Sequence, residues 1–151
     1  MIVLKTYVTV TKKSLMAVFL STLFIIIVSG QFYAAKNPVV NGKTHAQRVA
    51  YIKSLSLLPD EENASSKNIV IPDIFSDVYD NYNKLQMKSG YDLTPYKGVE
   101  ATVYTYPVGR IKQENNDEYY VNLIVYKGRI IGGDISSRNF YGEMLPLSSQ
   151  N

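Results

Sequence analysis

The chain has 151 residues, of which 46% are hydrophobic and 19% charged, a composition that indicates one globular domain and excludes a disordered protein. It contains no cysteine, which excludes a disulfide scaffold, a thiolate zinc site, a cysteine nucleophile and a lipoprotein anchor. The net charge is +3, but Lys5, Lys12 and Lys13 precede every acidic residue. Without these three lysines, 13 Lys and Arg stand against 13 Asp and Glu. The rest of the chain therefore has no excess of positive charge, and no nucleic-acid binding is expected.

Residues 14–35 contain no charged side chain and predict a membrane-spanning helix. At about 1.5 Å per residue this run measures about 33 Å, enough to cross a hydrocarbon core of about 30 Å. Lys12 and Lys13 directly before it predict a cytoplasmic segment at 1–13 and an extracytoplasmic remainder, hence a single-pass protein of the cell membrane. Small residues ahead of Gln31 leave open a cleavable signal peptide, in which case the domain would be secreted.

The folded domain is expected to begin after a tether at 36–43, which contains Pro, Gly and Asn but shows no periodicity. Thr44 and Gln47 fit a capping box, and apolar residues at helical spacing predict a short amphipathic helix that ends before Pro59. Residues 60–67 are first acidic and then rich in Ser and Asn, which indicates a loop.

The clearest helix of the sequence follows a short strand predicted at 68–71 and ended by Pro72. Asp73 stands near the start of this helix, and Gly90 stands just after its end. Its expected core face consists of residues spaced three and four apart, namely Phe75, Val78, Tyr79, Tyr82, Leu85 and Gln86.

Three strands are predicted next, at Val99–Tyr106, Tyr119–Tyr126 and Arg129–Ser136, because apolar and polar residues alternate in them. Lys127 and Gly128 predict a two-residue hairpin turn, since glycine adopts the positive φ that such turns require.

The third of these strands alternates out of phase with its neighbour. A regular register would place Asp134 on the core face and Ile135 outside it. One extra residue at Gly132 and Gly133 would reverse this, so a β-bulge is predicted there, with Asp134 delivered to the polar side of the sheet.

The order of these elements predicts an α+β protein: an N-terminal transmembrane helix followed by a two-layer domain of two helices packed on a small, mainly antiparallel sheet. The domain is expected to occupy residues 44–147, with a short tail at 148–151.

Four segments carry a resemblance to a known family: Ile71–Asn83, Gly90–Leu93, Tyr96–Gly98 and Val121–Asp134. Over roughly residues 45–145 the chain resembles an uncharacterised family of Gram-positive bacterial proteins, domain of unknown function 4830. The resemblance implies a membrane-anchored or exported domain. It implies no catalytic residue, because the family has no assigned activity.

The polar residues of the sequence do not form a recognisable catalytic motif. His45 is the only histidine and is expected to be a solvated residue in the first turn of its helix, since no serine stands in a nucleophile context. The acidic run Asp60–Glu62 lacks the ligand spacing and turn glycine of a calcium loop. Asp77 and Asp80 have a spacing that is common on exposed helical faces. We therefore predict no enzyme, no metal and no cofactor.

The remaining candidate site is a mixed aromatic and polar face of the sheet. Its expected members are Tyr104, Tyr106, Tyr120, Asn122, Tyr126 and Asp134. Tyrosine is enriched at interfaces, which favours partner binding, although cross-strand aromatic pairs also stabilise sheets, and the second helix or the C-terminal tail would then cover them.

These features favour a membrane-anchored extracytoplasmic binding or interaction module of the bacterial cell envelope. Its expected partner is an envelope protein or polymer. The alternative is a small extracytoplasmic enzyme with an acidic residue near Asp134.

Overall fold

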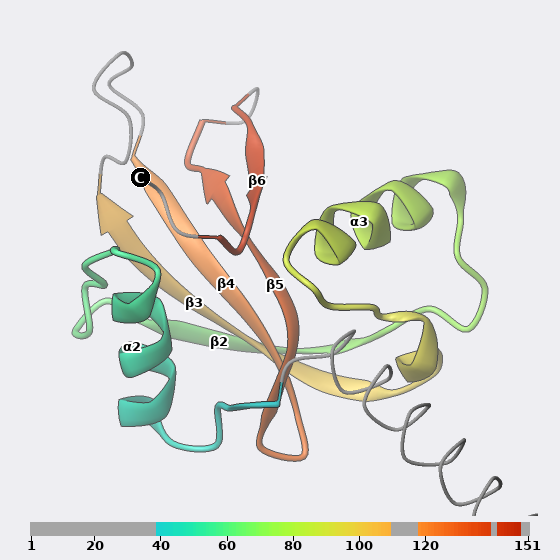
Figure 1. Ribbon diagram of the computed structural model, residues 1–151, viewed down its shortest axis with the longest axis horizontal. Coiled ribbons are helices and arrows are strands. Elements are labelled where there is room, and N and C mark those ends of the chain that lie inside the picture. The colour runs from blue at the N-terminus through green and yellow to red at the C-terminus, as the bar shows by residue number, and fades with distance from the viewer. Residues whose placement is uncertain (1–38, 110–117, 140–141, 149–151) are drawn as a thin grey trace, which may run out of the picture. The chain divides into compact units, whose positions relative to one another are not determined.

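The computed structural model describes residues 39–109, 118–139 and 142–148, all of them within the compact unit 36–151 (Figure 1). Its elements are β1 (Val40–Asn41), α2 (His45–Ser54), β2 (Ser65–Val70), α3 (Asp77–Lys88), the 3₁₀ helix η1 (Thr94–Tyr96), β3 (Glu100–Gly109), β4 (Tyr119–Tyr126), β5 (Arg129–Ser137) and β6 (Met144–Pro146). The predicted cytoplasmic segment and transmembrane helix lie outside the described residues. No helix in these ranges has the length and apolarity needed to span a membrane.

One antiparallel sheet connects all the described strands. The strand order is β1-β5-β4-β3-β2. The strand β6 also pairs with β5, on the same edge as β1 but at the other end of β5. The expectation of an α+β protein with two helices on a mainly antiparallel sheet is confirmed. The predicted tether at 36–43 includes two residues, Val40 and Asn41, that pair with Ile130 and Arg129 of β5.

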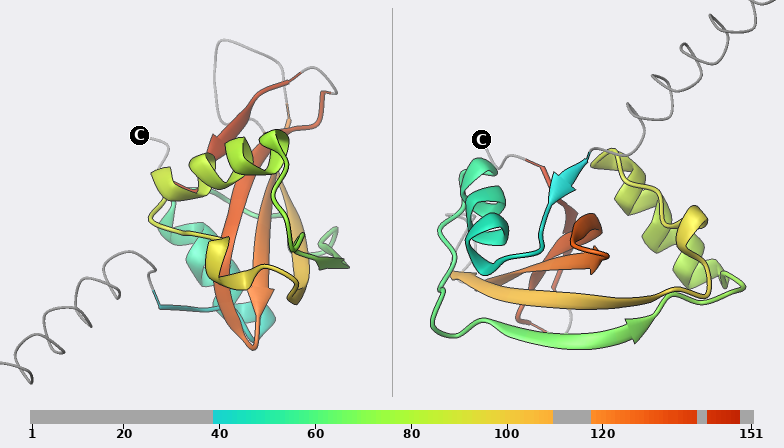
Figure 2. Two further views of the ribbon diagram at one scale, coloured as in Figure 1. Left: turned by 90° about the vertical axis from the view of Figure 1, so that its right-hand side faces the viewer. Right: turned by 90° about the horizontal axis from the view of Figure 1, so that it is seen from below.

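The two helices cover opposite faces of the central strands, as the two views in Figure 2 show. On one face, Leu123 of β4 shares a core with Ile52 of α2. On the other face, Ile124 of β4 shares a second core with Ile131 of β5, and Tyr82 of α3 packs against it. The predicted two-layer arrangement is therefore wrong, because the sheet is apolar on both faces and each face needs its own helix.

The first helix is set by its N-terminal cap, as predicted. The Thr44 side chain accepts a hydrogen bond from the Gln47 amide at 3.2 Å, and the Gln47 side chain accepts one from the Thr44 amide at 3.1 Å. This capping box satisfies two amides that the helix itself leaves unpaired.

The second helix begins at Asp77, is capped by Ser76 and ends at Lys88, with Gly90 at a positive φ just beyond it. Its buried residues are Asn83 and Gln86, whereas Val78, a predicted core residue, is 80% exposed. At about 100° per residue, Val78 and Leu85 lie roughly a quarter turn from the centre of the stripe formed by Tyr79, Tyr82, Asn83 and Gln86. Val78 is thus solvent-facing and Leu85 only half-buried.

The β4–β5 hairpin has the predicted two-residue turn, with both Lys127 and Gly128 at positive φ. Asn122 faces Asp134 across the strands, and Val121 faces Ile135, so Asp134 lies on the predicted side. The register shifts where Ile124 pairs with Gly132 and Val125 with Ile130. The extra residue is therefore Ile131 and not a glycine. As a result Ile131 and Gly132, although neighbours, both lie on the α3 side, where Ile131 enters the second core.

Candidate functional site

The structure divides the six predicted site residues between the two faces of the sheet. Tyr104 pairs with Leu123 and Tyr106 with Val121, so these two tyrosines lie on the α2 side. Tyr120, Asn122, Tyr126 and Asp134 lie on the α3 side. The predicted single tyrosine face is wrong, because the β3–β4 register places the tyrosines of β3 in phase with the apolar positions of β4.

On the α2 side, Tyr104 and Tyr106 hold a buried arginine. Arg48 is 7% exposed, and its Nε donates to the Tyr106 hydroxyl at 3.0 Å. One terminal nitrogen donates to the carbonyls of Gly42 at 2.8 Å and Lys43 at 3.1 Å. The guanidinium lies 3.6 Å from the centre of the Tyr104 ring, a cation–π contact. The arginine thus joins α2, the β1–α2 connection and β3.

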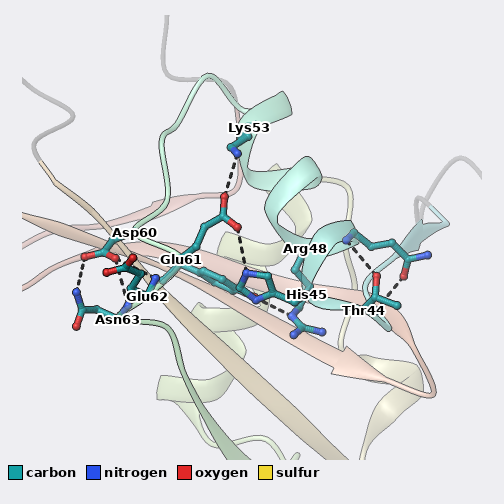
Figure 3. A network of polar contacts seen from close by, with 10 residues as sticks. Thr44, His45, Arg48, Lys53, Asp60, Glu61, Glu62 and Asn63 are labelled. Carbon is teal, nitrogen blue, oxygen red and sulfur yellow. Dashed lines mark hydrogen bonds and ion pairs between the residues drawn. The ribbon is translucent and has the colours of Figure 1, made fainter.

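The contacts continue outward to the loop after α2, as Figure 3 shows. The Tyr106 hydroxyl lies 3.3 Å from His45 Nδ1, and His45 Nε2 lies 3.2 Å from a carboxylate oxygen of Glu61. Lys53 donates to the other oxygen of Glu61 at 3.0 Å. Hydrogen bonds from Lys53 first, and then from His45, lower the pKa of Glu61. We call the set Arg48, Tyr104, Tyr106, His45, Glu61 and Lys53 the Arg48 cluster.

A histidine between a phenol and a carboxylate is an arrangement that transfers protons in enzymes. Here the Tyr106 side chain is only 1% exposed, and Arg48 occupies its hydroxyl. The neighbouring Asp60 accepts hydrogen bonds from Asn63 and from the Glu62 amide, and the bonds from Asn63 lower its pKa. These contacts fasten the loop to the helix and give a substrate no access to the phenol.

On the α3 side, a row of polar side chains crosses three strands. Thr105 of β3 donates to the Asn122 side-chain oxygen at 2.8 Å. The Asn122 amide nitrogen donates to Asp134 at 2.8 Å and to Ser136 at 3.0 Å. The Tyr82 hydroxyl of α3 donates to the second Asp134 oxygen at 2.8 Å. We call Thr105, Asn122, Asp134, Ser136 and Tyr82 the Asp134 ladder.

Asp134 is the buried end of this ladder, with 4% of its surface exposed. Burial raises the pKa of Asp134, and the hydrogen bonds from Asn122, Tyr82 and Ser136 only partly oppose this. Burial, and then the nearby Asp134 charge, raise the pKa of Tyr82, so the phenol keeps its proton and acts as the donor.

The glycine pair beside Asp134 lets α3 approach the sheet. Gln86 is fully buried, and its side-chain oxygen accepts a hydrogen bond from the Gly133 amide at 2.7 Å. A Cβ atom at Gly132 would lie 2.9 Å from that oxygen and 3.1 Å from Leu93. The sequence signal for this close contact is the Gly132–Gly133 pair, which the alternation pattern alone attributes to a bulge.

Sequence reasoning missed Arg48 as a site residue. The signal was present, because Arg48, Ile52 and Leu55 follow the spacing i, i+4, i+7 and therefore share one helical face. A cation on a buried stripe needs acceptors, and Tyr106 and the carbonyls of Gly42 and Lys43 are those acceptors.

A surface hollow of about 380 Å³ lies where β3 ends and β4 begins. It is lined by Leu58, Asp60, Pro107, Val108, Gly109, Glu118, Tyr119 and Arg138. Glu118 and Arg138 form an ion pair at its wall. None of the six predicted site residues lines this hollow.

Residues 54–135 match the family model described as Domain of unknown function (DUF4830). The chain belongs to this family. The part that matches the DUF4830 model contains Tyr82, Thr105, Asn122 and Asp134 of the ladder, whereas Arg48 and His45 precede it. No curated protein and no solved structure gives a significant match to the chain.

Proposed function

We propose that this DUF4830 protein is a membrane-anchored extracytoplasmic binding module of the bacterial cell envelope, with an envelope protein or polymer as its partner. The support for the anchor is the charge-free run 14–35 after Lys12 and Lys13. The domain would then be the extracytoplasmic part of a single-pass protein, or a secreted domain if the run is cleaved as a signal peptide.

The observation that carries the binding proposal is the α3-side face of β4. Tyr120, Asn122 and Tyr126 lie at alternate positions of this strand, and each is partly exposed. Tyr126 is in edge-to-face contact with Tyr96, with ring centres 5.9 Å apart, and Asn122 is fixed by the Asp134 ladder. Partly exposed aromatic rings on a rigid sheet offer contact area at low entropic cost.

The burial of Asp134 favours binding over catalysis. Its two carboxylate oxygens accept hydrogen bonds from Asn122 and Tyr82, and only 4% of the residue is exposed. A substrate would have to displace α3 to reach it. The ladder therefore supports a structural role for Asp134, in which it holds the neighbouring face rigid. We propose neither a reaction nor a cofactor.

Crosslinking in intact cells, followed by purification of the tagged full-length chain, tests this proposal. The double variant Tyr120→Ser, Tyr126→Ser is expected to lose the crosslinked partner and to retain its fold. Tyr104→Ser is the matched control, because it removes the same kind of side chain from the opposite face of the neighbouring strand. Equal partner recovery from the double variant and the parent would contradict the proposal, with thermal melting used to verify folding.

A further inference from the structure

The strand β2 forms one outer edge of the sheet along its full length. Its six residues pair without interruption with β3, from Ser65 opposite Thr105 to Val70 opposite Glu100. Among the described strands β2 pairs with β3 alone, and Figure 2 shows it at the outer margin of the sheet. Ile69 of β2 is half-buried, and the other five residues of the strand are exposed. The edge thus has backbone N–H and C=O groups that face no other strand of the described residues.

The two edges of the sheet differ in how they are protected. At the opposite edge, β5 is covered by two short strands, β1 at one end and β6 at the other. Proteins protect open edges with short strands, proline, bulges or charged side chains. The β2 strand has six residues, contains no proline and has no bulge in its register. Of these protective features it therefore has only a charged side chain, that of Lys67.

We propose that the β2 edge binds an extended segment of another protein, which adds to the sheet as a further strand and carries an acidic residue opposite Lys67. Backbone donors and acceptors on the edge recognise the partner's backbone, and this is the mode of β-strand addition. Lys67 lies at the centre of the strand, and no described carboxylate pairs with it. Opposite charges across neighbouring strands stabilise their pairing, which selects an acidic partner.

A second copy of this chain is a poorer occupant. A symmetric antiparallel pairing of two β2 strands needs a two-fold axis perpendicular to the sheet. With the strands centred on one another, this symmetry places the two Lys67 side chains opposite or diagonal to each other on the same face. Like charges in these positions destabilise the pair.

The proposal does not depend on where the chain is located or on the α3-side face, so its test is independent of the crosslinking experiment. The test uses the ¹⁵N-labelled full-length protein in detergent micelles. The ligand is a capped nonapeptide of alternating threonine and valine with a central glutamate. We expect saturable shifts of the amide signals of residues 65–70.

Three matched comparisons identify the binding mode. N-methylation of alternate amides along one edge of the peptide is expected to abolish binding, because it removes the backbone donors. Replacing the central glutamate by lysine is expected to weaken binding by about threefold to tenfold. The variant Lys67→Glu should reverse this charge preference, whereas Lys84→Glu, at an exposed position of α3, should leave it unchanged.

Several results would overturn the proposal. These are the absence of shifts at millimolar peptide, shifts confined to residues outside β2, and binding that survives N-methylation of the peptide. Sedimentation equilibrium gives a further check, since a dimer that the neutral variant Lys67→Thr strengthens would mean that the edge pairs with a second copy.

Discussion

Replacing Arg48 by methionine is expected to destabilise the domain strongly, although the substitution preserves most of the apolar stem. The Tyr106 hydroxyl, which is almost fully buried, loses its hydrogen-bond donor, at a cost of about 1–3 kcal/mol. The lost cation–π contact with Tyr104 adds about 0.5–1 kcal/mol. Lys43 is exposed, so water replaces the donor at its carbonyl, but Gly42 is buried and its carbonyl is left without that donor. The two tyrosine contacts alone account for about 2–4 kcal/mol, and the buried Gly42 carbonyl adds to this cost.

Urea unfolding followed by circular dichroism measures this loss, and the Tyr106→Phe variant completes a double-mutant cycle. Because both substitutions remove the same hydrogen bond, their combined effect should be smaller than the sum of the single effects. Lys53→Met is the control, since Lys53 is exposed and its loss should leave the melting temperature within about 2 °C of the parent. Additive effects in the cycle, or an Arg48→Met variant as stable as the parent, would refute the role assigned to this arginine.

Three further predictions follow from the packing. Ile52→Ala, at a fully buried position, should cost about 2–5 kcal/mol, while Val78→Ala, on the exposed side of α3, should change the stability by less than about 0.5 kcal/mol. If urea unfolding shows that Val78→Ala costs as much as Ile52→Ala, the core face assigned to α3 is wrong. Gly132→Ala should destabilise by about 1–3 kcal/mol, because its Cβ would lie 2.9 Å from the Gln86 oxygen, and a thermal melt unchanged from the parent would disprove this close contact. The pKa of Asp134 is raised above its ordinary value of 3.8 in the folded state. Between these two pKa values the folded state keeps the proton that the unfolded state releases, so the free energy of unfolding should fall as the pH rises from about 4 through the raised pKa. Asp134→Asn should flatten this slope in urea unfolding at a series of pH values, and an unchanged slope would mean that Asp134 is not the titrating group.

Local signals in the sequence predicted much of the fold. The capping box at Thr44 and Gln47, the bounds of β4 and the turn at Lys127 and Gly128 depend on neighbouring residues only, and the structure confirms them. The side of the sheet on which Asp134 lies was also predictable, because the alternation in β4 and β5 requires one extra residue between them.

The candidate site was harder to predict, because it depends on which face each strand presents to which helix. In β3, both alternating sets contain apolar and polar residues: Ala101, Val103 and Thr105 form one, and Thr102, Tyr104 and Tyr106 the other. Such a pattern does not select a register, and the sequence alone therefore predicts the wrong face for the tyrosines of β3. Burial of a polar residue such as Gln86 depends on the close approach of α3 to the glycine pair, which is a tertiary contact.

The most direct test of the proposed binding module uses the absence of cysteine from the chain. A single Arg138→Cys substitution in the full-length protein, at an exposed position whose side chain lies over the Tyr120 ring, is labelled in intact cells with a membrane-impermeant maleimide that carries a photoreactive group. We predict labelling from outside the cell and a light-dependent crosslink to an envelope component. Lys53→Cys, at an exposed site on the opposite side of the sheet, should be labelled without forming that crosslink. Labelling at position 138 only after the membrane is permeabilised, or the same crosslink from both positions, would contradict the proposal.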